Sequence, residues 1–244
     1  MMNGEDCRTL VVVPAFNEEE SVAGVVEELR AYEPRWDVLV IDDGSSDRTA
    51  EMARRAGAKV VSLVRNLGIG GAVQTGFLYA LQKGYGCAVQ CDGDGQHPPE
   101  GVSLLVETIK KGGADVVVGS RFLNGGKSGF RSTPSRRLGI SLLALFLGRL
   151  CGQVVTDPTS GLRAYNTRSL LFLSRNYPRD YPEPEALLLI HRHGLTFREV
   201  AVTMRERRAG TSSLGGWTPL VYMAKVLLSL AVETLRPLRS KRSV

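Results

Sequence analysis

The sequence contains few cysteines and no signal-peptide segment, and both shortages limit what the chain can be. Four cysteines occur among 244 residues, none in a CxxC spacing, so folding does not require a disulfide framework. The first six residues carry acidic groups and no apolar segment of signal-peptide length, so we do not expect secretion. These observations favour a reducing, cytoplasmic compartment.

Apolar segments of the roughly 20 residues needed to cross a bilayer are also missing. Two shorter apolar segments, 138–148 and 219–232, have basic residues at their ends or within them. They suit helices that lie in the membrane interface. They suit equally amphipathic helices that pack on a sheet or on a partner subunit.

The basic residues are clustered. The formal net charge is only +6, but arginines and lysines gather at 131–137, 205–208 and 236–242, each next to an apolar segment. This arrangement is typical of a protein resting on an anionic membrane surface, although charge runs are often simply solvated. No aromatic residues interleave these charges and no nucleic-acid-binding motif accompanies them, so a nucleic-acid partner is not expected.

The rest of the sequence alternates strand and helix patterns. A chain of this length with 43% hydrophobic residues can bury the core of one large α/β domain. Short Val-rich runs predict strands buried on both faces of a parallel sheet, at 9–13, 37–41, 59–63, 86–90 and 115–118. Helical patterns follow at 18–31, 47–56, 70–83, 98–111 and 185–193. Because such sheets bind ligands beyond the carboxyl ends of their strands, the loops there are the candidate site.

Two carboxylates one residue apart follow the fourth strand, and an amide comes two residues later: Asp92, Asp94 and Gln96. Hard oxygen ligands at the end of a buried strand suit Mg²⁺ or Mn²⁺ carrying a phosphate-bearing substrate. The same Asp-Gly-Asp-Gly tetrapeptide also suits a simple turn. The loops after the second and fifth predicted strands add further charged residues to this edge, Asp42, Asp43 and Arg121. A classical dinucleotide site fails, because no GxGxxG motif follows the first strand.

Five motifs then occur in an order that resembles family 2 glycosyltransferases with the GT-A fold: VPAFNE, IDDGSSD, NLGIG, DGDGQHP and GSR. The segments 157–165 and 207–212 resemble the branch that transfers a sugar to a polyprenyl or dolichyl phosphate. The resemblance covers residues 8–214. It implies a GT-A domain over 1–214, with a mostly parallel α/β sheet flanked by helices, and a C-terminal apolar helix and basic tail over 215–244.

The resemblance also implies roles for individual residues. The nucleotide base and ribose would lie against the first two loops, and Asp92, Asp94 and Gln96 would hold the divalent ion. Arg121 and Arg207 would contact phosphate oxygens. The implied nucleotide-sugar-binding residues are Pro14, Ala15, Phe16, Asn17, Glu18, Ile41, Asp42, Asp43, Asp92, Gly93, Asp94, Arg121 and Arg207. As alternatives, Asn17 and Glu18 could cap the first helix, and Arg121 could be a surface residue.

Asp94, Asp157 and Arg207 are the catalytic residues that the resemblance implies. Asp157 would lie near the acceptor, but a polyprenyl phosphate is already anionic near neutral pH and needs positioning more than deprotonation. The alternative role for Asp157 is structural: it would cap the following turn or hold Arg163. Where polyprenyl-phosphate mannosyltransferases commonly carry Lys, this chain has Ser213, so mannose is not assumed.

Three functions remain open from the sequence. The leading one is inverting, metal-dependent transfer of a hexosyl group from a nucleotide sugar to a polyprenyl phosphate, by a peripheral protein at the cytoplasmic membrane face. A separate integral membrane subunit could serve as its anchor. The alternatives are transfer to a saccharide or polysaccharide acceptor, and a catalytically silent subunit that only binds nucleotide sugars.

Overall fold

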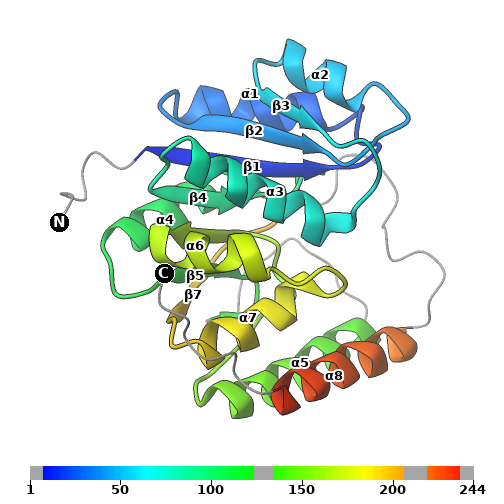
Figure 1. The fold of residues 1–244 in the computed structure, drawn as a ribbon, viewed down its shortest axis with the longest axis vertical. Coiled ribbons are helices and arrows are strands. Elements are labelled where there is room, and N and C mark those ends of the chain that lie inside the picture. Colours follow the sequence, from blue (N-terminus) through cyan, green and yellow to red (C-terminus); the bar gives the residue numbers. More distant parts are fainter. Residues whose placement is uncertain (1–7, 124–133, 206–218, 237–244) are drawn as a thin grey trace.

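The computed structural model describes residues 8–123, 134–205 and 219–236. These residues form a seven-stranded sheet in the order β3-β2-β1-β4-β6-β5-β7 (Figure 1). The strands are β1 (Thr9–Ala15), β2 (Asp37–Asp42), β3 (Lys59–Ser62), β4 (Cys87–Gln90), β5 (Val116–Ser120), β6 (Arg163–Asn166) and β7 (Phe197–Ala201). Strands β1, β4 and β5 are buried along their whole length, as their apolar sequences require.

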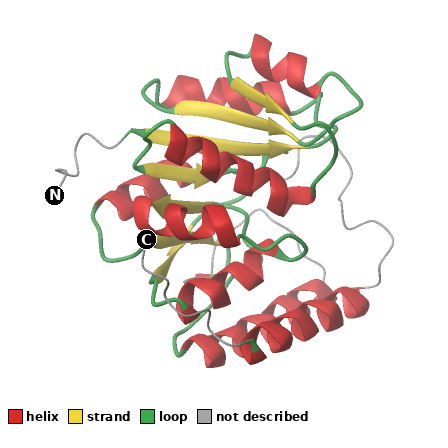
Figure 2. Ribbon diagram, viewed as in Figure 1, coloured by secondary structure: helices red, strands yellow, loops and turns green. Residues whose placement is uncertain are grey.

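One strand runs against the others. Strand β6 pairs antiparallel with both β4 and β5, whereas every other neighbouring pair is parallel. The carboxyl ends of the six parallel strands therefore meet at one edge of the sheet, where β6 begins with Arg163 (Figure 2). That edge is where loops can gather polar groups around a ligand.

Helices cover both faces of the sheet. Helices α1 (Val22–Tyr32), α2 (Thr49–Arg55) and α4 (Pro99–Lys110) bury apolar side chains against one face. Helices α3 (Gly68–Gln82), α5 (Pro134–Cys151), α6 (Thr167–Asn176), α7 (Pro182–Arg192) and α8 (Pro219–Leu235) contribute to the core on the other face. Helices α5 and α8 lie side by side below α7 (Figure 1). Among the described helices, none is long and apolar enough to cross a membrane.

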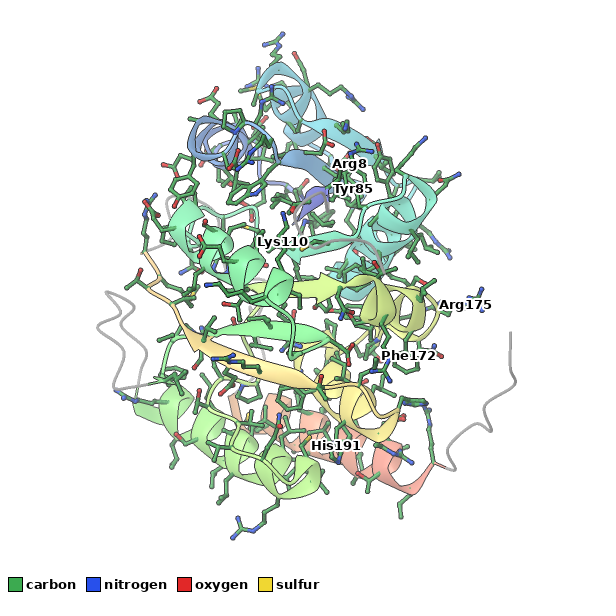
Figure 3. All side chains as sticks on the ribbon, turned by 90° about the vertical axis from the view of Figure 1, so that its left-hand side faces the viewer. Arg8, Tyr85, Lys110, Phe172, Arg175 and His191 are labelled. Atoms are coloured by element: carbon green, nitrogen blue, oxygen red, sulfur yellow. The ribbon has the colours of Figure 1, made fainter. Side chains whose placement is uncertain are left out.

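The amino edge of the sheet is held by a charged cluster. The Asp37 carboxylate accepts hydrogen bonds from Arg8 at 3.0 Å, from the Tyr85 hydroxyl at 2.7 Å and from Lys59. Burial opposes ionisation of Asp37, but these three donors outweigh it and lower its pKa to about 2. Arg8 also lies over the Tyr85 ring, as Figure 3 shows from this side. The charged cluster therefore stabilises the amino edge of the sheet. The candidate functional site lies at the opposite, carboxyl edge.

The predicted fold class is confirmed, and each predicted strand and helix is present with its ends shifted by a few residues. Strands β6 and β7 and helix α6 were not predicted. The helix expected over 185–193 begins earlier, at Pro182, and the one expected over 138–148 extends over Pro134–Cys151. The expected domain boundary between 214 and 215 lies outside the described residues.

Helix α3 approaches the sheet so closely that residue 76 must be glycine. A Cβ at Gly76 would lie 2.3 Å from Cγ1 of the buried Val12 on β1. We therefore expect Gly76→Val to lower the free energy of unfolding by about 1–3 kcal/mol, measured by urea denaturation. Leu78→Val places the same side chain at an exposed position of the same helix and should change the free energy by less than about 0.5 kcal/mol. Equal stability of the two variants would contradict the close contact.

Candidate active site

The loops that follow β1 and β2 are fastened to one another. Asn17 adopts a φ of 55°, and its backbone N–H donates to Ser45 Oγ at 3.0 Å. Its side-chain oxygen accepts from the Ser46 N–H at 2.9 Å, and the Glu18 N–H donates to Thr49 Oγ1 at 2.8 Å. Asn tolerates the left-handed conformation better than most side chains, which explains its presence here. The two loops therefore form one unit at the carboxyl edge.

The two acidic residues at the end of β2 also organise this edge. Asp42 accepts the Ser45 N–H at 3.0 Å, and Asp43 accepts the Leu67 N–H at 2.8 Å, just before helix α3 begins. Burial raises the pKa of Asp43 above its ordinary value, although the backbone N–H groups of the α3 start oppose the shift. Nearby, Phe16 is 47% exposed and offers an aromatic face to a ligand.

Strands β1 and β4 bring the first two loops next to the acidic segment. Pro14 pairs with Ile41 and Ala15 with Asp42 in the parallel ladder. Gly93, which follows β4, lies against the Pro14 carbonyl, since a Cβ there would be 3.3 Å from that oxygen. The expected base-and-ribose residues and the expected metal segment are thus neighbours.

The acidic segment after β4 is fixed from several sides. Asp92 Oδ2 lies 3.1 Å from Nε2 of His97, a ring that is almost fully buried. Asp94 is buried and accepts the Gln96 N–H at 3.0 Å. Gln96 in turn accepts the Arg205 N–H at 2.9 Å and donates its amide to the Arg205 carbonyl at 3.4 Å. The Asp92 and Asp94 carboxylates are therefore held in place by a hydrogen-bonded turn, and their role as metal ligands stays a prediction.

The donor set of this turn suits a hard divalent ion. Asp92 keeps 30% of its side chain exposed while His97 orients it, which is the usual arrangement of a ligating carboxylate and its outer partner. Within the described part of the chain, no group of three or more His, Cys, Asp or Glu side chains forms a closed metal cage. Two carboxylates and one amide instead match Mg²⁺ or Mn²⁺, which take their remaining ligands from water and substrate phosphates.

A buried ion pair joins the end of β5 to the segment before β6. Arg121 donates from Nε to Asp157 Oδ2 at 2.6 Å and from Nη2 to Oδ1 at 2.7 Å, and both side chains are almost fully buried. Glu199 on β7 accepts the backbone N–H groups of Thr156 and Asp157 at 2.8 and 2.9 Å. Arg121 is therefore not a surface residue, and both carboxylate oxygens of Asp157 are already engaged.

The expectation that Asp157 holds Arg163 is wrong. The Arg163 guanidinium donates instead to the carbonyls of Ser160 at 2.9 Å and Pro158 at 3.0 Å, because it lies inside the turn that precedes β6. This turn brings Gly161 against the acidic segment, where a Cβ would lie 2.7 Å from Asp92 Oδ2. Any side chain at residue 161 would displace the Asp92 carboxylate.

Several residues of this site were not predicted, and others lie outside the described residues. His97, Gly161, Arg163 and Glu199 all support the expected site residues, yet only His97 lies close enough in sequence to Asp92 to be found by spacing. Arg207, Ser213 and residues 131–133 of the basic cluster 131–137 lie outside the described residues. The predicted site residues that the structure describes lie on the loops at the carboxyl edge and in the segment before β6, and their roles stay predictions.

The mostly parallel seven-stranded sheet, with helices on both faces and β6 antiparallel, has the GT-A fold of glycosyltransferases. The fold is similar to that of glucosyl-3-phosphoglycerate synthase from Mycobacterium tuberculosis, solved in complex with Mn²⁺, UDP and phosphoglyceric acid. The TM-score is 0.72 and the identity 21%, over 95% of this chain and 80% of that one. The family model of glycosyl transferase family 2 matches residues 10–172, and the chain belongs to that family.

Two relatives match over most of their length. The chain is 34% identical to the polyprenol monophosphomannose synthase of Mycolicibacterium smegmatis, over 90% of this chain and 85% of the relative. It is also 34% identical to the undecaprenyl-phosphate mannosyltransferase of Micrococcus luteus, over 86% of this chain and 88% of the relative. The resemblance to the polyprenyl-phosphate branch is thereby confirmed.

Removing one charge of the buried pair should damage both folding and activity. Asp157→Asn leaves the Arg121 guanidinium buried without its carboxylate, so we expect the free energy of unfolding to fall by about 3 kcal/mol or more, with a strong loss of sugar transfer. The double variant Arg121→Met/Asp157→Leu removes both charges and should recover much of the stability but not the activity. Near-normal turnover of Asp157→Asn would remove Asp157 from the catalytic residues.

Proposed function

We propose that the protein transfers a sugar from a nucleotide-sugar donor to a polyprenyl phosphate. The observation that carries the proposal is the preorganised Asp92–Asp94 turn at the carboxyl edge, in a chain whose relatives named above are polyprenyl-phosphate mannosyltransferases. The donor would lie across this edge, with its base near Phe16 and the Asp42–Asp43 pair and its diphosphate near the turn. Residues 14–18 and 41–43 would line the nucleoside.

Asp92, Asp94 and Gln96 would hold Mg²⁺ or Mn²⁺ at the donor diphosphate. When bound, such an ion neutralises the negative charge that develops on the departing nucleoside diphosphate. The protein's own part is to orient the two carboxylates through His97 and the backbone, before any ligand arrives. A direct phosphate contact by Arg121 or Arg207 stays a prediction, and the Arg121 guanidinium already makes two bonds to Asp157.

Chemistry at the acceptor needs no strong base. One oxygen of the anionic acceptor phosphate would attack the anomeric carbon as the bond to the nucleoside diphosphate breaks, which inverts the configuration. Asp157 is fully buried and has both carboxylate oxygens bonded to Arg121, so it is poorly placed to take a proton. We therefore favour the structural role for Asp157, in which it fixes the turn that precedes β6.

We further propose that helices α5 and α8 rest on the membrane that carries the acceptor. Each helix exposes leucine or valine side chains at spacings of four and three residues, so they share one side of that helix. Exposure ranges from 45% at Val232 to 84% at Leu235, while Leu143 and Val226 anchor the opposite sides in the core. The exposed positions are Leu138, Leu142 and Leu145 on α5 and Leu228, Val232 and Leu235 on α8. This fits a peripheral protein on the cytoplasmic membrane face, and an integral membrane partner stays a prediction.

A transfer assay tests the proposed reaction. Incubation with a panel of labelled nucleotide sugars, a short polyprenyl phosphate and Mn²⁺ or Mg²⁺ should give a labelled product that extracts into organic solvent. Asp94→Asn should lower the rate at least about a hundredfold, because it removes a charge at the diphosphate, whereas Glu107→Gln on the exposed side of α4 should not change it. A labelled saccharide left in the aqueous phase would support a saccharide acceptor, and nucleotide-sugar binding without any turnover would support a silent subunit.

Vesicle binding tests the membrane surface. Replacing Leu138, Leu142 and Leu145 together with Asn should weaken binding to vesicles that contain anionic lipid by about tenfold or more, measured by co-sedimentation. The double variant Leu104→Asn/Leu171→Asn makes the same change at exposed positions of α4 and α6 and should bind normally. Equal binding by both variants would argue against α5 as the contact.

A further inference from the structure

A small polar site lies beside Asp92 on the face of the sheet covered by α3, α6 and α7. Gln90 at the end of β4 and Arg163 at the start of β6 are partners in the antiparallel ladder, and both are fully buried. Glu183 approaches them from the first turn of α7. We call these three side chains, Gln90, Arg163 and Glu183, the polar niche.

The niche contains two buried donors that have no partner among the described residues. The hydroxyls of Tyr165 and Tyr177 donate to Gln90 Oε1 at 3.3 and 3.1 Å, which fixes the amide so that Nε2 is the remaining donor. Gln90 Nε2 and Arg163 Nη1 are both buried without a hydrogen-bond partner. A buried donor without a partner destabilises the folded protein, so two of them side by side on neighbouring strands indicate a place built for a ligand's polar atoms.

Glu183 supplies the complementary acceptor. Burial raises the pKa of Glu183, although the charge of Arg163 and the neighbouring Gln90 side chain oppose the shift. The Glu183 carboxylate therefore lies near both members of the β4–β6 pair. Asp92 also acts on Glu183, which places the niche within electrostatic reach of the proposed metal site.

The charges of the niche select what it can bind. A phosphate would meet the Arg163 guanidinium but would be repelled by the carboxylates of Glu183 and Asp92. A sugar hydroxyl is neutral, accepts a hydrogen bond from Gln90 Nε2 or Arg163 Nη1, and donates one to Glu183. The turn that Arg163 holds also packs Gly161 against Asp92. The residues of this turn therefore border both the niche and the proposed diphosphate site.

We propose that the polar niche binds hydroxyl groups of the sugar being transferred, with Glu183 as a residue that determines which sugar is accepted. This inference rests on the proposed function, because it assumes a nucleotide-sugar donor at Asp92. A buried site that bonds a substrate hydroxyl rejects analogues that lack it far more strongly than an apolar pocket can, since the protein's own polar groups are then left unpaired. Glu183 therefore determines which sugar is accepted, whereas the contacts to the nucleoside determine how tightly the nucleoside diphosphate part of the donor binds.

Glu183→Gln tests this role, and Glu185→Gln is its matched control. Glu185 lies two residues further along the same helix turn but bonds to Ser229 Oγ on α8 at 2.5 Å, away from the niche. We expect Glu183→Gln to lower kcat/KM for the preferred donor by about a hundredfold, with unchanged affinity for the free nucleoside diphosphate and Mn²⁺ measured by calorimetry. Deoxy-sugar donors that lack the bound hydroxyl should be used equally by the original protein and by Glu183→Gln. Glu185→Gln should retain its discrimination between donors.

Two results would overturn the inference. Unchanged donor kinetics in Glu183→Gln would mean that the niche holds only an internal water. Equal losses of thermal stability, nucleoside-diphosphate affinity and turnover would mean a structural role. If the unmodified protein transfers no sugar, the proposed function fails independently of this inference. The niche is then tested by calorimetry alone. Glu183→Gln must weaken binding of the nucleotide sugar but not of the nucleoside diphosphate.

Discussion

The buried ion pair between Arg121 and Asp157 is the constraint on which the site depends. It ties the end of β5 to the segment that enters β6, and Glu199 fixes that segment from β7. A few residues further on, the same segment places Gly161 against the Asp92 carboxylate. An ion pair that is almost fully buried is stable only when both partners remain, so the geometry of this half of the site depends on these two charges.

The rest of the carboxyl edge is organised by neutral and backbone hydrogen bonds. The loops after β1 and β2 are joined through Asn17 and the hydroxyls of Ser45 and Thr49, and Asp43 connects them to the start of α3. Arg48 joins the same two loops through its ion pair with Glu19, and together these contacts shape the surface proposed for the nucleoside. The acidic turn after β4 lies between the two halves, so a nucleotide sugar spanning the edge would touch both.

Much of this arrangement follows from the sequence, and the exceptions have physical reasons. Continuous Val-rich runs identify the parallel strands, and the carboxyl-edge rule then places Asp42, Asp43, Asp92 and Asp94 together. Strand β6 could not be recognised, because Arg163-Ala164-Tyr165-Asn166 is short and has polar residues at both ends, and its Arg is buried by hydrogen bonds to carbonyls of the turn just before it. The Arg121–Asp157 pair links positions 36 residues apart, which local patterns cannot reveal. The sequence therefore predicts a phosphate contact for Arg121 but does not reveal its buried partner Asp157.

The central claim is that the turn containing Asp92 and Asp94 binds a nucleoside diphosphate through a divalent ion. Calorimetric titration of a panel of nucleoside diphosphates, with Mn²⁺ and with chelator, tests it without any assumption about the sugar or the acceptor. The account predicts that one diphosphate binds in the presence of Mn²⁺, and that binding is lost with chelator and in Asp92→Asn, while Glu107→Gln behaves normally. Equally tight binding with chelator, or in Asp92→Asn, would contradict it.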